Sequence, residues 1–227
     1  KTYSMLNKPL SQPSSLLKLK EDRVQARFEP KEHRYFGPNG EVYTSVTQAM
    51  RIYTEKAYEG IPKETLKRKA ELGTAVHLAT EYYDEDDLDI GACNPKLIPY
   101  IDAYARFKEE IKPEIIFKEL RLIHPRRFYA GAIDRVVFLD DSFWIIDLKT
   151  TRLLYEFVGI QLAAYAELLN ANLECPIPFK RAALQLKDDG TYVFSKHEAD
   201  DDWYAFLACL TLNNWNINHG SPFKYRL

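Results

Sequence analysis

Three strand-like runs in the middle of the chain constrain its fold more than any other feature. Residues 115–123, 128–139 and 143–149 are rich in β-branched and aromatic side chains, and only Asp140-Asp141-Ser142 separates the last two runs. So short a connection is typical of antiparallel neighbours in a sheet. A leucine- and alanine-rich segment that follows at 156–170 predicts a helix. The middle of the chain therefore predicts a sheet with helices packed on it.

The flanking segments extend this arrangement. Strands are predicted at 24–28, 33–36 and 41–43, with a turn at 37–40, and Ser45 or Thr47 is expected to cap a short helix through Arg51. Helices are predicted at 63–83, after Pro62, and at 95–111. The C-terminal part predicts a hairpin of 182–186 and 192–194 and a last helix at 200–216. This order predicts an α/β (α+β) fold with a central mixed β-sheet flanked by helices and an N-terminal β-rich extension.

Length and composition favour one domain. The 227 residues, 46% of them hydrophobic, can form one sizeable core, and the segment 1–22 is interpreted as an arm or linker that precedes a single domain at 23–227. No apolar run approaches the roughly 20 residues of a membrane helix, and we expect a cytoplasmic protein without a membrane partner. Three scattered cysteines suggest neither a zinc site nor disulfides. The net charge of −2 confines any nucleic-acid surface to a local patch.

Charged residues interrupt two of the central strands. Side chains alternate along a strand, so Asp147 and Lys149 share a face with Phe143 and Ile145. On the preceding strand the same rule predicts one common face for Ala130, Ala132, Asp134, Val136 and Phe138. The tight turn between the strands then brings Asp134 close to Asp147, and Glu119 lies on the strand before them.

Acids that converge on an apolar sheet repel one another unless a cation joins them. Their oxygen ligands suit Mg²⁺ or Mn²⁺, which can lower the pKa of bound water and neutralise charge on a phosphate. Lys149 would hold or deprotonate the attacking water, or stabilise the pentacovalent phosphorus. The ordinary alternative is that Asp134 and Asp147 are strand-end acids paired with Arg135 or Lys149.

Several motifs resemble those of one nuclease superfamily. Gly131-x-x-Asp134, thirteen residues before Asp147-Leu148-Lys149-Thr150, resembles the core signature of the PD-(D/E)XK nucleases. Gly73-x-x-x-His77 and Gln161-x-x-x-Tyr165 resemble two further motifs of its RecB-like branch, which includes phage exonucleases. The matching region spans residues 70–170, and its specificity comes from the joint order and spacing of the motifs.

The resemblance implies a restriction-endonuclease-like core and a role for each matching residue. One or two Mg²⁺ or Mn²⁺ ions would be held by Asp134, Asp147, Glu119, His77 and the Leu148 carbonyl. Lys149 would be the catalytic lysine, and Gln161 and Tyr165 would orient the active site or contact a phosphate. Some RecB-like relatives hold an iron–sulfur cluster with four cysteines; this chain has three, wrongly placed, so no cluster is expected.

Each of these side chains also has a structural interpretation. His77 could be a satisfied core histidine, and Glu119 could pair with Lys118 or Arg121. The pair at 161 and 165 could be a half-buried helix face.

Two groups of basic residues are candidates for the DNA path. Lys63, Lys67, Arg68 and Lys69 precede Gly73 on its helix, and Arg121, Arg126 and Arg127 lie near His124. Lys67, Arg68, Arg126 and Arg127 are the residues for which we predict DNA contacts; solvated surfaces are the alternative. Tyr35, Phe36 and Tyr43 could stack on unpaired bases, although such residues more often belong to a core.

The resemblance implies a metal-dependent exonuclease that acts on single- or double-stranded DNA ends. Its expected setting is phage or mobile-element recombination, repair or replication, in the bacterial or infected-cell cytoplasm. A helicase, a single-strand-binding protein or an annealing protein would be natural partners. The alternatives are a structure-specific endonuclease on the same fold and a non-catalytic DNA-binding or assembly protein.

Overall fold

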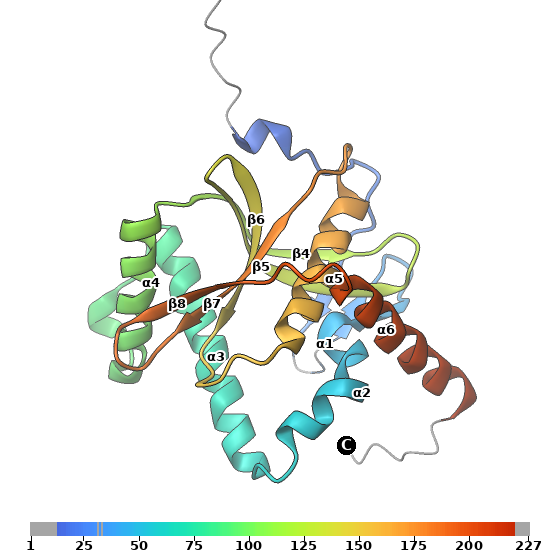
Figure 1. Cartoon of the computed structure of the whole chain (residues 1–227), viewed down its shortest axis with the longest axis horizontal. Coiled ribbons are helices and arrows are strands. Elements are labelled where there is room, and N and C mark those ends of the chain that lie inside the picture. Colours follow the sequence, from blue (N-terminus) through green and yellow to red (C-terminus); the bar gives the residue numbers. More distant parts are fainter. Residues whose placement is uncertain (1–12, 31, 33, 221–227) are drawn as a thin grey trace, which may run out of the picture.

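A computed structural model describes residues 13–30, 32 and 34–220, and within them eight strands form one mixed sheet (Figure 1). The strands are β1 (Arg27–Glu29), β2 (Arg34–Phe36), β3 (Val42–Ser45), β4 (Glu114–Ile123), β5 (Tyr129–Leu139), β6 (Ser142–Lys149), β7 (Lys180–Leu186) and β8 (Tyr192–Lys196). Their order is β1-β2-β3-β5-β6-β7-β8, and β4 pairs with β5. The predicted fold class, with its β-rich N-terminal extension, is confirmed.

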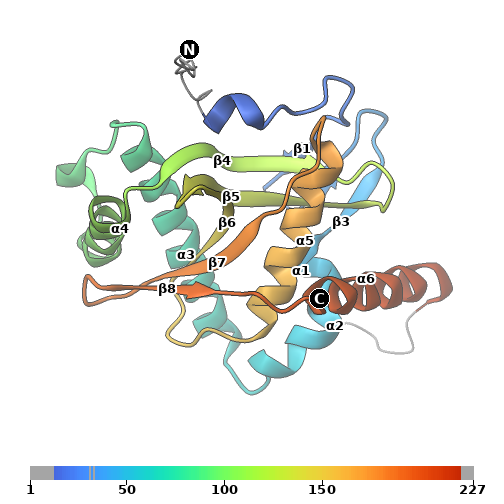
Figure 2. The ribbon, with the colours of Figure 1, turned by 45° about the horizontal axis from the view of Figure 1, so that its top comes forward.

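Helices cover both faces of the sheet. They are α1 (Val46–Ala49), α2 (Arg51–Thr54), α3 (Lys63–Asp84), α4 (Ile98–Ile111), α5 (Phe157–Asn172) and α6 (Asp202–His219), with short 3₁₀ helices η1 (Pro13–Leu16), η2 (Glu55–Tyr58), η3 (Ile90–Ala92) and η4 (Pro95–Leu97). One apolar core lies between the sheet and α5, with α1 and α6 beside that helix, and a second core lies under α3 and α4 (Figure 2).

The alternation predicted for β6 is confirmed and explains the two cores. Phe143 and Ile145 pack on the α5 side, whereas Trp144, Ile146 and Leu148 pack on the α3–α4 side. A strand buried on both faces needs helices on both sides. The crossover through α5 then makes β7 parallel to β6.

Most predicted bounds lie within a few residues of the structure, and the differences have local causes. The capping box of Ser45 and Gln48 starts α1 as expected, but α1 ends at Ala49 and α2 and η2 follow it. The predicted strand 24–28 is displaced to β1, and the predicted helix 95–111 begins as a 3₁₀ turn, with α4 starting at Ile98. Tyr35 and Tyr43 are buried in a third apolar cluster, so their rings belong to the core.

The single face predicted for alternate residues of β5 is wrong. Gly131 faces Tyr165 and Leu168 of α5, so its neighbours Ala130 and Ala132 point the other way. Val136 and Phe138 nevertheless pack in the α5-side core. The alternation therefore slips by one residue between Gly131 and Val136, and Asp134 lies within the slip.

The N-terminal arm is only partly described. Residues 1–12 lie outside the described residues. Leu17 is buried in the α5-side core, and Leu19 forms a bridge with Leu173. The division at residue 22 stays a prediction. No helix in the described ranges is long and apolar enough to cross a bilayer.

Candidate active site

The catalytic candidate Asp134 lies where β5 changes its partner along one edge. Residues 135–139 of β5 pair with β6, whereas residues 129 and 130 pair with β3. Arg135 and Ile146 form the last pair between β5 and β6. One residue beyond this pair, Asp134 lies opposite Asp147. There the Leu148 N–H donates to Asp134 Oδ2 at 2.7 Å. Asp134 Oδ2 thus accepts a backbone hydrogen bond from β6, and Oδ1 remains available to the site.

Glu119 lies beside Asp134 on the other edge of β5. The pairs Lys118–Arg135 and Leu120–Ile133 place it there, and its φ of 46° departs from the extended conformation of its neighbours. A left-handed conformation is uncommon for a residue with a side chain, and it is typical of positions where function constrains the backbone. Its Oε1 is buried, 3.6 Å from Arg135 Nη1, without a hydrogen-bond donor among the described residues.

His77 approaches these acids from α3. Its Nε2 lies 3.1 Å from the Leu148 carbonyl oxygen, which fixes the ring. Its Nδ1 lies 3.5 Å from Asp134 Oδ1 and 3.8 Å from Glu119 Oε1. The side chain keeps 28% of its surface exposed. The histidine therefore belongs to an accessible polar cluster and is not a closed core residue.

Lys149 starts a chain of polar contacts on the α5 side. Its Nζ lies 2.5 Å from Asp147 Oδ2 and donates to Gln161 Oε1 at 3.1 Å. Gln161 Nε2 in turn donates to the Tyr165 hydroxyl at 3.0 Å. Both α5 side chains are buried. A Cβ on Gly131 would lie 2.8 Å from Tyr165 Cε1, so this glycine makes room for the ring.

The electrostatics of the cluster are those of crowded acids and cations. Burial lowers the pKa of His77, but the neighbouring Asp134 and Glu119 outweigh it and raise this pKa to about 10. Burial raises the pKa of Asp147, although Lys149 opposes it. Burial lowers the pKa of Lys149, but Asp147 and Asp134 raise it overall. The pKa of Asp134 falls, because His77 and Lys149 outweigh its burial.

The residues present fit a divalent cation. His77, Glu119 and Asp134 each offer a ligand atom, and these atoms lie within 4.8 Å of one another. Two carboxylates with an imidazole suit Mn²⁺ or Mg²⁺, and the buried Glu119 Oε1 without a donor is an acceptor that a cation would satisfy. Asp147 lies outside this group. Ligand roles for Asp147 and the Leu148 carbonyl stay predictions.

Arg135, which the sequence suggested only as a possible ion-pair partner of Asp134 or Asp147, is a structural partner of the site. The Arg135 side chain is buried, with 1% of the residue exposed. Its Nη1 donates to the backbone carbonyl oxygen of Asp134, and its Nε donates to the Asp84 carboxylate at the end of α3. The only local sign was an arginine beside a predicted metal ligand in an apolar strand.

An aromatic cluster also borders the site. Tyr58 of η2 lies near Lys149, whose charge opposes the rise that burial causes in the tyrosine pKa. Its ring packs edge-on against Tyr155 and Phe157, in the segment that follows β6. Tyr58 of η2 thus lies near Lys149, although the sequence predicted no element between Arg51 and Pro62.

The basic residues predicted to contact DNA are all exposed. On α3, with about 100° per residue, Lys67 stands about 80° from His77 around the axis, whereas Arg68 stands about 180° away. Arg126 and Arg127 occupy the turn between β4 and β5, where both backbone N–H groups donate to His124 Nδ1. Their roles in binding DNA stay predictions, and geometry favours Lys67 over Arg68.

One comparison, with models of protein families, agrees with this arrangement. The family model of the PD-(D/E)XK nuclease superfamily matches residues 95–216, which include Glu119, Asp134, Asp147, Lys149 and Gln161. No curated protein gives a match.

Among solved structures, a protein from Eubacterium rectale to which exonuclease activity has been ascribed is 13% identical, with a TM-score of 0.47, covering 79% of this chain and 82% of its own. An alkaline exonuclease from Laribacter hongkongensis is 13% identical, with a TM-score of 0.39, covering 78% of this chain and 88% of its own. The structure of SSO0001 is 16% identical, with a TM-score of 0.40, covering 80% of this chain and 79% of its own.

Proposed function

Since the chain belongs to the PD-(D/E)XK nuclease superfamily, we propose that it is a Mg²⁺- or Mn²⁺-dependent exonuclease that hydrolyses phosphodiester bonds at DNA ends. One observation supports this most: the acids of β4 and β5, His77 of α3 and the ion pair of Lys149 with Asp147 meet at one point of the sheet. These residues come from distant segments: His77 and Lys149 are 72 positions apart in the sequence.

The chain's own residues would divide the work. Asp134, Glu119 and His77 would hold the cation, with Asp147 close by. When bound, the cation supplies an activated water and neutralises charge on the phosphate. Lys149, held by Asp147 and Gln161, would donate to a phosphate oxygen or to the attacking water. Tyr165 would keep the Gln161 amide oriented through its hydroxyl.

The exonuclease assignment rests on the two additional motifs. His77, Gln161 and Tyr165 are the residues that resemble those of the RecB-like branch, and all three reach the core site. We extend the proposal to a role in phage or mobile-element DNA recombination, repair or replication on that resemblance alone. Helicase, single-strand-binding or annealing partners belong to the same proposal.

The test is a cleavage assay with purified protein. End-labelled linear single-stranded and double-stranded DNA and closed circular DNA are incubated with Mg²⁺, with Mn²⁺ and with EDTA. The proposal expects metal-dependent loss of linear DNA while circles persist. Cleavage of circles would instead identify an endonuclease, and no cleavage under either metal would favour a binding or assembly role.

A further inference from the structure

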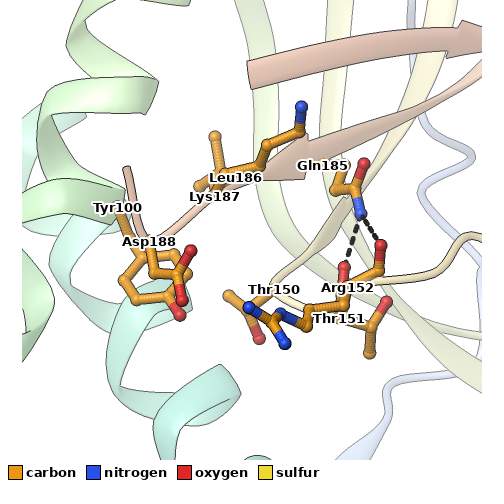
Figure 3. A pocket seen from close by; sticks show the side chains of 8 residues that line it. All are labelled: Tyr100, Thr150, Thr151, Arg152, Gln185, Leu186, Lys187 and Asp188. Carbon is orange, nitrogen blue, oxygen red and sulfur yellow. Dashed lines mark hydrogen bonds between the residues drawn. The ribbon is translucent and has the colours of Figure 1, made fainter. Parts of the chain in front are cut away.

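A pocket opens at the carboxyl ends of the parallel strands β6 and β7, one residue beyond Lys149. Its volume is about 340 Å³, at the lower end of the range for small-ligand sites. The lining residues are Tyr100, Thr150, Thr151, Arg152, Gln185, Leu186, Lys187 and Asp188 (Figure 3). The carboxyl ends of parallel strands are where open α/β sheets commonly bind ligands.

Gln185 fixes the wall of the pocket next to the catalytic lysine. It pairs with Lys149 in the β6–β7 ladder and is buried. Its Nε2 donates to the carbonyl oxygens of Thr151, at 2.5 Å, and Arg152, at 3.0 Å (Figure 3). These bonds hold the loop after β6 in one shape, so Arg152 keeps a defined position relative to Lys149.

The pocket offers cationic groups that the protein itself does not use. Within the described part of the chain, neither the Arg152 guanidinium nor the Lys187 ammonium has an ion-pair or hydrogen-bond partner. Arg152 extends toward Tyr100 and Asp188 in Figure 3. A guanidinium with a nearby threonine hydroxyl suits a phosphate, and an aromatic ring with a carboxylate suits a base that carries an amino group.

We propose that this pocket is a subsite for the nucleotide adjacent to the cleaved phosphodiester bond. Arg152 and Thr150 contact that nucleotide's phosphate, while Tyr100 and Asp188 face its base. The inference rests on the proposed nuclease function and deepens it, because it names what lies beside the reacting phosphate. Thr150 directly follows Lys149, so the pocket begins one residue beyond the group that would hold the reacting phosphate.

The test compares two substrates of the same metal-loaded enzyme. A short linear oligonucleotide can fill the subsite, whereas bis(p-nitrophenyl) phosphate offers a phosphodiester without nucleotides. For Arg152→Ala, the ratio of kcat/KM for the oligonucleotide to that for the small diester is expected to fall about tenfold or more, since one charge-assisted contact is lost. The control is Arg106→Ala, which removes an exposed arginine of α4 that does not line the pocket. It should leave the ratio unchanged.

A binding measurement separates this inference from the proposed function. Titration of deoxycytidine 5′-monophosphate in EDTA, followed by calorimetry, should show weaker binding to Arg152→Ala than to Arg106→Ala. If the wild type cleaves neither substrate, the nuclease proposal fails and this titration alone decides the subsite. An unchanged substrate ratio, or equal losses on both substrates, would overturn the subsite.

Discussion

Replacing Arg135 by methionine tests whether its buried guanidinium holds β5 against α3 and α4. The guanidinium Nε lies 2.8 Å from Asp84 Oδ2 and 3.2 Å from the Tyr104 hydroxyl. Its Nη2 lies 3.1 Å from Thr80 Oγ1 and its Nη1 2.7 Å from the Asp134 carbonyl oxygen. Methionine can fill most of the space but satisfies none of these acceptors.

The magnitude follows from what remains around Asp84. Removing one partner of a buried ion pair costs about 3–5 kcal/mol, because a charge is left without compensation. Lys108 stays 2.9 Å from Asp84 Oδ1, so the carboxylate keeps one cation and the lower end applies. A loss of about 3 kcal/mol corresponds to a fall in Tm of roughly 6–12 °C for a domain of this size.

The assay is thermal and urea unfolding followed by circular dichroism. Arg106→Met, an exposed change on the neighbouring α4, is the matched control and should alter stability by less than about 0.5 kcal/mol. Asp84→Asn completes a double-mutant cycle, in which the two losses should fall short of additivity by about 1 kcal/mol or more. A loss below about 1 kcal/mol for Arg135→Met, or strict additivity, would refute the reasoning.

Four further outcomes are expected. Lys149→Ala should reduce DNA cleavage by about 10²-fold or more in the nucleotide-release assay while its circular dichroism stays native, because a donor to the reacting phosphate is lost; wild-type rates would remove it from the site. Glu119→Gln should weaken Mn²⁺ binding, measured by calorimetry and by the rise in Tm that Mn²⁺ causes, about tenfold or more, and an unchanged affinity would exclude this ligand. Gly131→Ala should cost about 1–3 kcal/mol in urea unfolding, because its Cβ would meet the Tyr165 ring, and a neutral effect would show that the ring can move. Burial, aided by nearby arginines, lowers the pKa of His124 to about 4, whereas the unfolded chain takes up this proton near pH 6.5. The free energy of unfolding should therefore fall by on the order of 2 kcal/mol as the pH drops from about 6.5 to about 4. His124→Asn, which keeps an acceptor for the turn, should flatten the dependence of Tm on pH.

Short-range patterns in the sequence predicted much of the fold and the site. The alternation of β6 placed Asp147 and Lys149 on one face, and a three-residue turn was enough to bring Asp134 opposite Asp147. The spacing of Gln161 and Tyr165 predicted one common helix face, and in the structure Gln161 contacts both Lys149 and the Tyr165 hydroxyl.

Other features depend on contacts that no local pattern encodes. A slip of one residue reverses every later side chain on a strand, and nothing in the sequence of β5 marks the slip near Asp134. The contacts of Arg135 with α3 and α4, and those of Gln185 with the loop after β6, join segments that only the sheet topology brings together. Sequence patterns therefore predicted which candidate site residues lie together better than they predicted the residues that support them.

The partner change along β5 has a consequence for how the chain avoids aggregation. The meander β4–β5–β6 closes through short turns, whereas β3 joins β5 across about 85 positions, and such long-range parallel pairing is slow to form. Until β3 docks, residues 129 and 130 present an unpaired strand edge, a template for another chain. The β1–β3 segment thus covers this strand edge. A chain that lacked the segment would expose the edge of β5, the strand that carries Asp134, to other copies of the protein.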